Sequence, residues 1–450
     1  MTDQPPPDDQ NPFRGTPFEQ FFSGGAPDLG QLFSQIQSMM QPYDGPLNWD
    51  LAVDTARKTV AQSPDPTPSQ RERDEIADAV RLADHWLDET TDFPSGVTST
   101  AAWSRAEWVV GTTDVWKVLV EPIAASSVNA LGSALPSEAA DMGGPILAML
   151  GKAVGAMLAT QVGSGLGAMA GEVVSASDIG LPLGAAGTAA LVPANVARFA
   201  EGLDVPETDV RLYLALREAA HQRLFAGVPW LRDHLIGAVT DYAQGIEINT
   251  ERIQETMEER LRGVDPTNLE NMQSLMEGGL FELPQSPQQQ AALQRLEIAL
   301  ALVEGWVDEV VSQATAERMP TATKLQEAVR RRRAAGGPAE ETFASLVGLE
   351  LRPRRLRDAS TLWGSLRTRQ GTEARDGVWM SPHLLPTDAD LDDPLGFREG
   401  ADAPGEISAD DFDAELRNLL AGPEDKQADE QTDGQADEPG DQPSDDTTEG

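Results

Sequence analysis

The chain has 450 residues, no cysteine and a formal net charge of −40 at pH 7. The absence of cysteine excludes disulfides, thiolate nucleophiles and Cys-ligated zinc, and it favours a reducing, cytoplasmic compartment. The negative charge argues against nucleic acid and anionic membrane surfaces as partners, and the first residues lack the basic and apolar regions of a secretory signal.

Both ends of the chain have the composition of disordered segments. Residues 1–27 are rich in Pro, Gly, Asp and Gln, and residues 386–450 carry 22 acidic against 3 basic side chains. Between them, residues 28–385 are expected to form one mostly α-helical domain. Within the acidic tail, residues 408–420 predict a short helix with an N-cap, an apolar stripe and a glycine stop. This helix either packs on its own body or docks on a partner, and the sequence leaves both alternatives open.

Most of the predicted domain shows the hydrophobic period of helices, and alternating β-branched runs are few. In chain order, the expected helices cover residues 48–62, 68–87, 102–121, 136–174, 208–225, 229–244, 250–261, 287–318 and 322–334. Residues 346–385 mix arginines and aromatic side chains and give no definite secondary structure.

A stretch without formal charge, residues 153–171, has nearly the length of a membrane span. Its polar side chains and five glycines dilute its hydrophobicity. We therefore expect a buried helix of a soluble protein and no membrane span. Gly163, Gly167 and Gly171 recur at every fourth residue, which predicts the close approach of another helix.

The motif that bears most directly on function is Arg217-Glu218-Ala219-Ala220-His221. In His-Glu-x-x-His, two histidines four residues apart share one helical face and bind one Zn²⁺, while the Glu polarises the metal-bound water. Glu218 and His221 stand where that motif has its base and its second histidine. Arg217 stands in the place of the first histidine, and a guanidinium has no lone pair for zinc.

The helix expected at 208–225 points Arg217 and His221 towards the core, on one stripe with apolar residues. Burying an arginine is costly without a partner, so we expect a carboxylate beside Arg217, with Glu304 and Glu297 as candidates. Such a carboxylate could neutralise Arg217 or bind a metal. His234 could come near His221 as a further ligand, or it could be a supporting or surface residue.

The densest basic run is Arg330-Arg331-Arg332-Arg333. In so acidic a chain, this run is expected to close a helix at its C-terminus and to pair with internal carboxylates rather than to bind nucleic acid.

The chain resembles the actinobacterial zincin-like metallopeptidases, which are described as hydrolases or zinc-dependent metalloproteases. One related branch is associated with deazaflavin coenzyme biosynthesis. The resemblance spans roughly residues 100–400 and is carried by residues 163–171, 178–183, 192–195, 217–221, 228–235 and 304–307.

The resemblance implies a mostly helical zincin-like fold and a zinc site. In it, Glu218 is the general base, His221 and Glu304 are metal ligands, and His234 is an additional candidate ligand. Because Arg217 replaces the first ligand, we interpret the protein as a zincin-like, formally metal-dependent hydrolase with a degenerate motif, whose peptidase activity is expected to be lost. The alternative is a noncatalytic binding or scaffold protein that recognises a protein or peptide.

Overall fold

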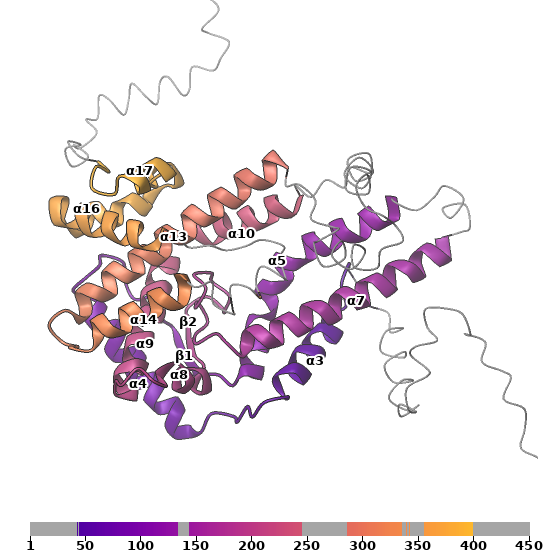
Figure 1. The fold of residues 1–450 in the computed structure, drawn as a ribbon, viewed down its shortest axis with the longest axis horizontal. Helices are drawn as coiled ribbons and strands as arrows, with labels where there is room; N and C mark the ends of the chain where they lie inside the picture. Colours follow the sequence, from indigo (N-terminus) through magenta and orange to yellow (C-terminus); the bar gives the residue numbers. More distant parts are fainter. Residues whose placement is uncertain are drawn as a thin grey trace, which may run out of the picture. The chain divides into compact units, whose positions relative to one another are not determined.

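In a computed structural model of the chain, we describe residues 43, 45–133, 144–244, 286–334, 339, 342 and 355–398. They are mostly α-helical, as the sequence predicts, and include two short strands (Figure 1). The disorder predicted for residues 1–27 and the helices predicted at 250–261 and 408–420 lie outside this part of the chain.

The longer helices are α3 (Trp49–Val60), α4 (Gln70–Leu87), α5 (Arg105–Ser133), α7 (Gly144–Ala170), α8 (Pro193–Ala200), α9 (Glu207–Gly227), α10 (Pro229–Gln244), α13 (Pro287–Thr315), α14 (Ala322–Ala334) and α16 (Leu356–Gly377). Shorter turns of helix follow at η1 (Val378–Met380), η2 (Pro382–Leu384) and α17 (Asp388–Asp392).

The two strands lie at places where the sequence predicts none. β1 (Ser99–Ala102) and β2 (Thr188–Leu191) pair in parallel, with Ser99 opposite Thr188. Each strand has a single β-branched residue, a threonine, and no aromatic residue, so the two segments carry little of the sequence signal of strands. This sheet lies beside α4 and α9, which both contact it.

The end of α5 also differs from the prediction. α5 continues through Pro122, although the sequence predicts its end at residue 121. Leu119, Val120 and Ala124 are buried on both sides of this proline, and α5 packs against α3 and α7, so packing offsets the lost hydrogen bond. The compact unit that includes these helices extends to Phe397, and Leu391 on α17 is buried in it.

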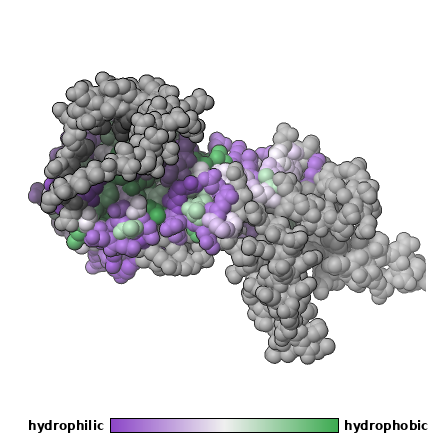
Figure 2. Space-filling model, turned by 90° about the horizontal axis from the view of Figure 1, so that it is seen from above, coloured by the Kyte–Doolittle hydropathy of each residue, from purple (hydrophilic) through white to green (hydrophobic). Residues whose placement is uncertain are grey.

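α3 and α7 pack closely through two glycines of α7. A Cβ atom on Gly163 would lie 2.3 Å from the Ala52 carbonyl oxygen, and one on Gly167 would lie 2.6 Å from Thr59 Cβ. The four-residue spacing therefore serves the helix contact that the sequence predicts. Among the described helices, none combines the length and apolar character that a membrane span requires. On the face shown in Figure 2, hydrophilic residues dominate the described surface, with smaller hydrophobic groups between them.

α9 lies at the centre of the unit and contacts α4, α8, α10, α13, α14 and β2. Each residue from Tyr213 to Leu224 is buried. Burial therefore extends around the whole helix, beyond the single apolar stripe that the sequence predicts, because neighbouring elements cover α9 on every side. α13 is similarly enclosed from Ala299 to Asp308. Charged residues on these two helices must consequently find partners inside the protein.

Candidate functional site

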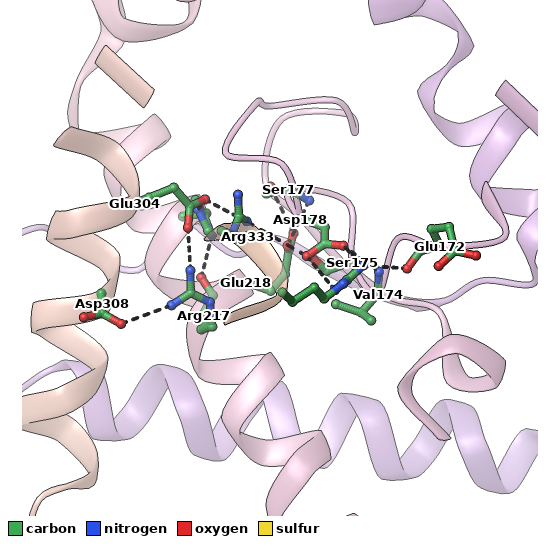
Figure 3. Close-up of polar contacts among 12 residues, drawn as sticks. Glu172, Val174, Ser175, Ser177, Asp178, Arg217, Glu218, Glu304, Asp308 and Arg333 are labelled. Atoms are coloured by element: carbon green, nitrogen blue, oxygen red, sulfur yellow. Dashed lines mark hydrogen bonds and ion pairs between the residues drawn. The ribbon is translucent and has the colours of Figure 1, made fainter. Parts of the chain in front are cut away.

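Arg217 on α9 is buried and pairs with Glu304 on α13, as the sequence predicts (Figure 3). Its Nη2 lies 2.5 Å from Glu304 Oε2, and its Nη1 lies 3.8 Å from Asp308 Oδ1. Burial disfavours the charged guanidinium, but the charges of Glu304 and other neighbours outweigh it and raise the pKa of Arg217. Of the two candidate partners, Glu304 is therefore the one observed to pair with Arg217.

His221 lies one helical turn after Arg217, and both of its ring nitrogens face acceptors. Nδ1 lies 2.8 Å from the Arg217 carbonyl oxygen, and Nε2 lies 3.0 Å from Glu304 Oε1. A carbonyl oxygen can only accept, so Nδ1 donates to it and has no lone pair for a metal. Nε2 directly faces the Glu304 carboxylate.

Glu304 on α13 contacts side chains from two other helices. α9 contributes Arg217 and His221, and α14 contributes Arg333, whose Nη2 lies 3.0 Å from Glu304 Oε1 (Figure 3). Burial would raise the pKa of Glu304, but the charges of Arg333, His221 and Arg217, with the hydrogen bond from His221, lower it to about 2. Glu304 is thus an ionised carboxylate, and each of its oxygens already accepts from a cationic group or an imidazole.

Glu218 is fully buried, and its carboxylate is held by the segment that precedes β2. The Ser177 backbone N–H donates to Oε2 at 3.1 Å, and Gln222 Nε2 donates to Oε1 at 3.0 Å. Burial raises the pKa of Glu218, against the charge of His221 and these hydrogen bonds. The residue predicted as the base therefore lies three residues before His221, and its oxygens accept hydrogen bonds from Ser177 and Gln222.

Asp308 is a carboxylate of this site that sequence reasoning missed. It follows Glu304 by four residues on α13, and its Oδ2 accepts from Arg330 at 2.5 Å, Ser360 at 2.9 Å and Gln326 at 3.0 Å. The four-residue spacing places both carboxylates on one face of α13, so the signal was present in the sequence.

The basic run of α14 pairs with internal carboxylates, as predicted. Arg330 reaches Asp308 and Arg333 reaches Glu304, while Arg332 Nη2 lies 3.0 Å from Asp178 Oδ2. Arg331 remains at the surface beside Glu327, since its side chain is 73% exposed. The run therefore ties α14 to α13 and to the segment between α7 and β2.

That segment contains a glycine whose backbone conformation and position both matter. Gly180 has φ +78°, and a Cβ atom there would lie 3.0 Å from Glu304 Oε1 and 3.3 Å from Leu300 Cδ2. A side chain at this position would be strained by the backbone conformation and would crowd the Glu304 carboxylate.

Asn195 lies in another segment that carries the resemblance. Its side chain accepts a hydrogen bond from Arg105 and donates to the backbone carbonyls of Ala170 and Val173.

His234 on α10 is not brought into this cluster. Its ring packs edge-on against Trp230, with centroids 5.4 Å apart. Partial burial, together with the charge of Arg295, lowers its pKa. No contact recorded for the described side chains joins His234 to His221 or Glu304, so its predicted role as a ligand finds no support in the geometry.

The model of one protein family, described as zincin-like metallopeptidase, matches residues 47–397. The chain belongs to this zincin-like family. Its fold is similar to the crystal structure of a "putative hydrolase with a novel fold" from Chloroflexus aurantiacus. The two are 19% identical, the match covers 78% of this chain and 97% of the other, and the TM-score is 0.55. No curated protein matches the chain.

Membership of the zincin-like family implies zinc, and the residues present do not fit a catalytic zinc site. Such a site takes three protein ligands and an open position. Here Arg217 provides a cation in place of the first ligand, and Glu304 and His221 are bound to each other. Among the described residues, no group of three or more His, Cys, Asp or Glu side chains is placed to hold a metal ion.

Proposed function

We propose that this zincin-like protein has lost metallopeptidase chemistry and acts by binding a protein or peptide. The observation that carries the proposal is the ion pair between Arg217 and Glu304, buried at the position where the motif calls for a metal and its first ligand. A guanidinium is always charged and repels a divalent cation held by the same carboxylate. The retained Glu218 therefore has no metal-bound water to activate.

The buried charges also explain why this constellation could persist without catalysis. Glu304 joins α9, α13 and α14 through Arg217, His221 and Arg333, all of them buried. Removing one member leaves the others without compensation, so the cluster is needed for the fold whether or not it reacts. We also propose that the protein is related to the actinobacterial branch associated with deazaflavin coenzyme biosynthesis. This relation is supported by the sequence segments that carry the resemblance.

Elemental analysis of protein purified without an affinity tag tests the loss of the metal. We expect clearly less than one tightly bound zinc per chain, because Arg217 removes a ligand and adds a positive charge. Stoichiometric zinc that disappears in His221→Ala would contradict the proposal and support the metal-dependent hydrolase instead.

Incubation with a mixed peptide library, with and without EDTA, tests the chemistry separately. We expect no chelator-sensitive cleavage, and we expect any peptide that the protein captures from the library to remain bound in EDTA. Chelator-sensitive cleavage that Glu218→Gln abolishes would show that a metal-dependent reaction survives.

A further inference from the structure

Two arginines from different helices bind the same carboxylate. Arg217 of α9 contacts Glu304 Oε2 at 2.5 Å, and Arg333 of α14 contacts Oε1 at 3.0 Å. Both side chains are about 6% exposed, and Glu304 is 1% exposed. Figure 3 shows the two guanidinium groups reaching Glu304 from separate elements. Glu304 therefore has a cationic partner on each oxygen.

We propose that Arg217 and Arg333 together take the place of a divalent metal ion on Glu304, and that Arg333 is a second metal-excluding residue. This inference rests on the proposed loss of metallopeptidase chemistry. The two guanidinium groups bring a charge of two, as a zinc ion would, and they link α9 and α14 to α13 without any bound ion. Replacing only Arg217 by histidine would leave the Arg333 cation in contact with Glu304.

The geometry shows why Arg333 matters separately from Arg217. Glu304 Oε1, the oxygen that Arg333 contacts, is also the oxygen that faces His221 Nε2, at 3.0 Å. A metal ion shared by His221 and Glu304 would have to lie near this oxygen. A guanidinium there adds an unfavourable interaction with a divalent cation and occupies the same lone pairs.

Zinc titration of five proteins tests this inference: the wild type, Arg217→His, Arg333→Met, and the double variants Arg217→His/Arg333→Met and Arg217→His/Arg331→Met. Arg331 is the matched control, since it belongs to the same basic run but is exposed beside Glu327. The readouts are zinc per chain after dialysis and the absorption spectrum of bound Co²⁺, which reports tetrahedral coordination. Circular dichroism confirms that each protein is folded.

We expect one tightly bound zinc only in Arg217→His/Arg333→Met, with loss of that zinc when His221→Ala is added. Arg217→His should bind zinc more than about 100-fold more weakly, because the positive charge of Arg333 remains on the Glu304 oxygen that the metal would need. The Arg331 control should behave like Arg217→His alone. The wild type and Arg333→Met should bind no stoichiometric zinc.

Equal affinities of Arg217→His and the double variant would show that Arg333 does not exclude the metal. A folded double variant without zinc would show that the pair does not stand in a metal's place. Either result overturns this inference and leaves the proposed function intact, whereas stoichiometric zinc in the wild type contradicts the proposed function itself. If Arg217→His/Arg333→Met does not fold, Arg217→His/Arg333→Gln carries the same expectation with an uncharged hydrogen-bond donor.

Discussion

The contact between α9 and α13 is built around buried charge, whereas the contact between α3 and α7 is built around glycine. In the first, Arg217, His221 and Glu304 exchange hydrogen bonds inside the core. In the second, Gly163 and Gly167 let the backbones of the two helices approach closely. A contact between buried charges is destabilised when one partner is removed. A close-packed contact is destabilised when side-chain volume is added.

The charged contact predicts the largest effect of a single substitution. Glu304→Ala leaves Arg217 and Arg333 buried without their shared carboxylate, and we expect it to lower the free energy of unfolding by about 3–5 kcal/mol. Urea denaturation measures the change. Glu317→Ala, at an exposed carboxylate just beyond α13, is the control and should stay within about 0.5 kcal/mol of the wild type. A loss below about 1 kcal/mol for Glu304→Ala would mean that these buried ion pairs contribute little to stability.

The sequence was sufficient to place the charged contact in outline, because its residues carry unambiguous chemistry. A buried arginine demands a carboxylate, and Glu304 lies at the edge of an apolar stripe on a long helix. The sequence could not assign Arg333 to Glu304, since four consecutive arginines look alike until α14 is oriented in space. It also could not place His234 relative to His221, because the direction of α10 relative to α9 depends on tertiary packing.

The glycine contact predicts an intermediate effect. Gly163→Val places a Cβ atom where 2.3 Å separates it from the Ala52 carbonyl oxygen, so α3 and α7 must move apart. We expect a loss of about 1–3 kcal/mol in the free energy of unfolding. Gly237→Ala on α10 is the matched control, because nothing lies within 4 Å of its added Cβ, and it should stabilise by about 0.4–1 kcal/mol. Equal effects of the two substitutions would show that close approach is not what Gly163 provides.

The same contrast in environments separates the two buried carboxylates of the site, whose pKa values move in opposite directions. Glu304 has a lowered pKa, so the stability it contributes is present above about pH 4.5 and is lost as the pH falls towards about 2. Glu218 has a raised pKa, so the folded state holds its proton more tightly than the unfolded state does. Its contribution is therefore favourable below its ordinary value of 4.5 and declines as the pH rises above it.

Glu218→Gln removes that decline and predicts the smallest effect. At about pH 4 the variant should match the wild type within about 1 kcal/mol, since an amide can still accept from the Ser177 N–H and donate to Gln222. From about pH 4 to about pH 8 the difference in the free energy of unfolding should grow in favour of the variant, because only the wild type must ionise a buried carboxyl. Urea denaturation across this range measures it, with Glu317→Gln as a control that should show no trend. A difference that shrinks with rising pH would mean that Glu218 is stabilised as a carboxylate, which is the state that a catalytic base requires.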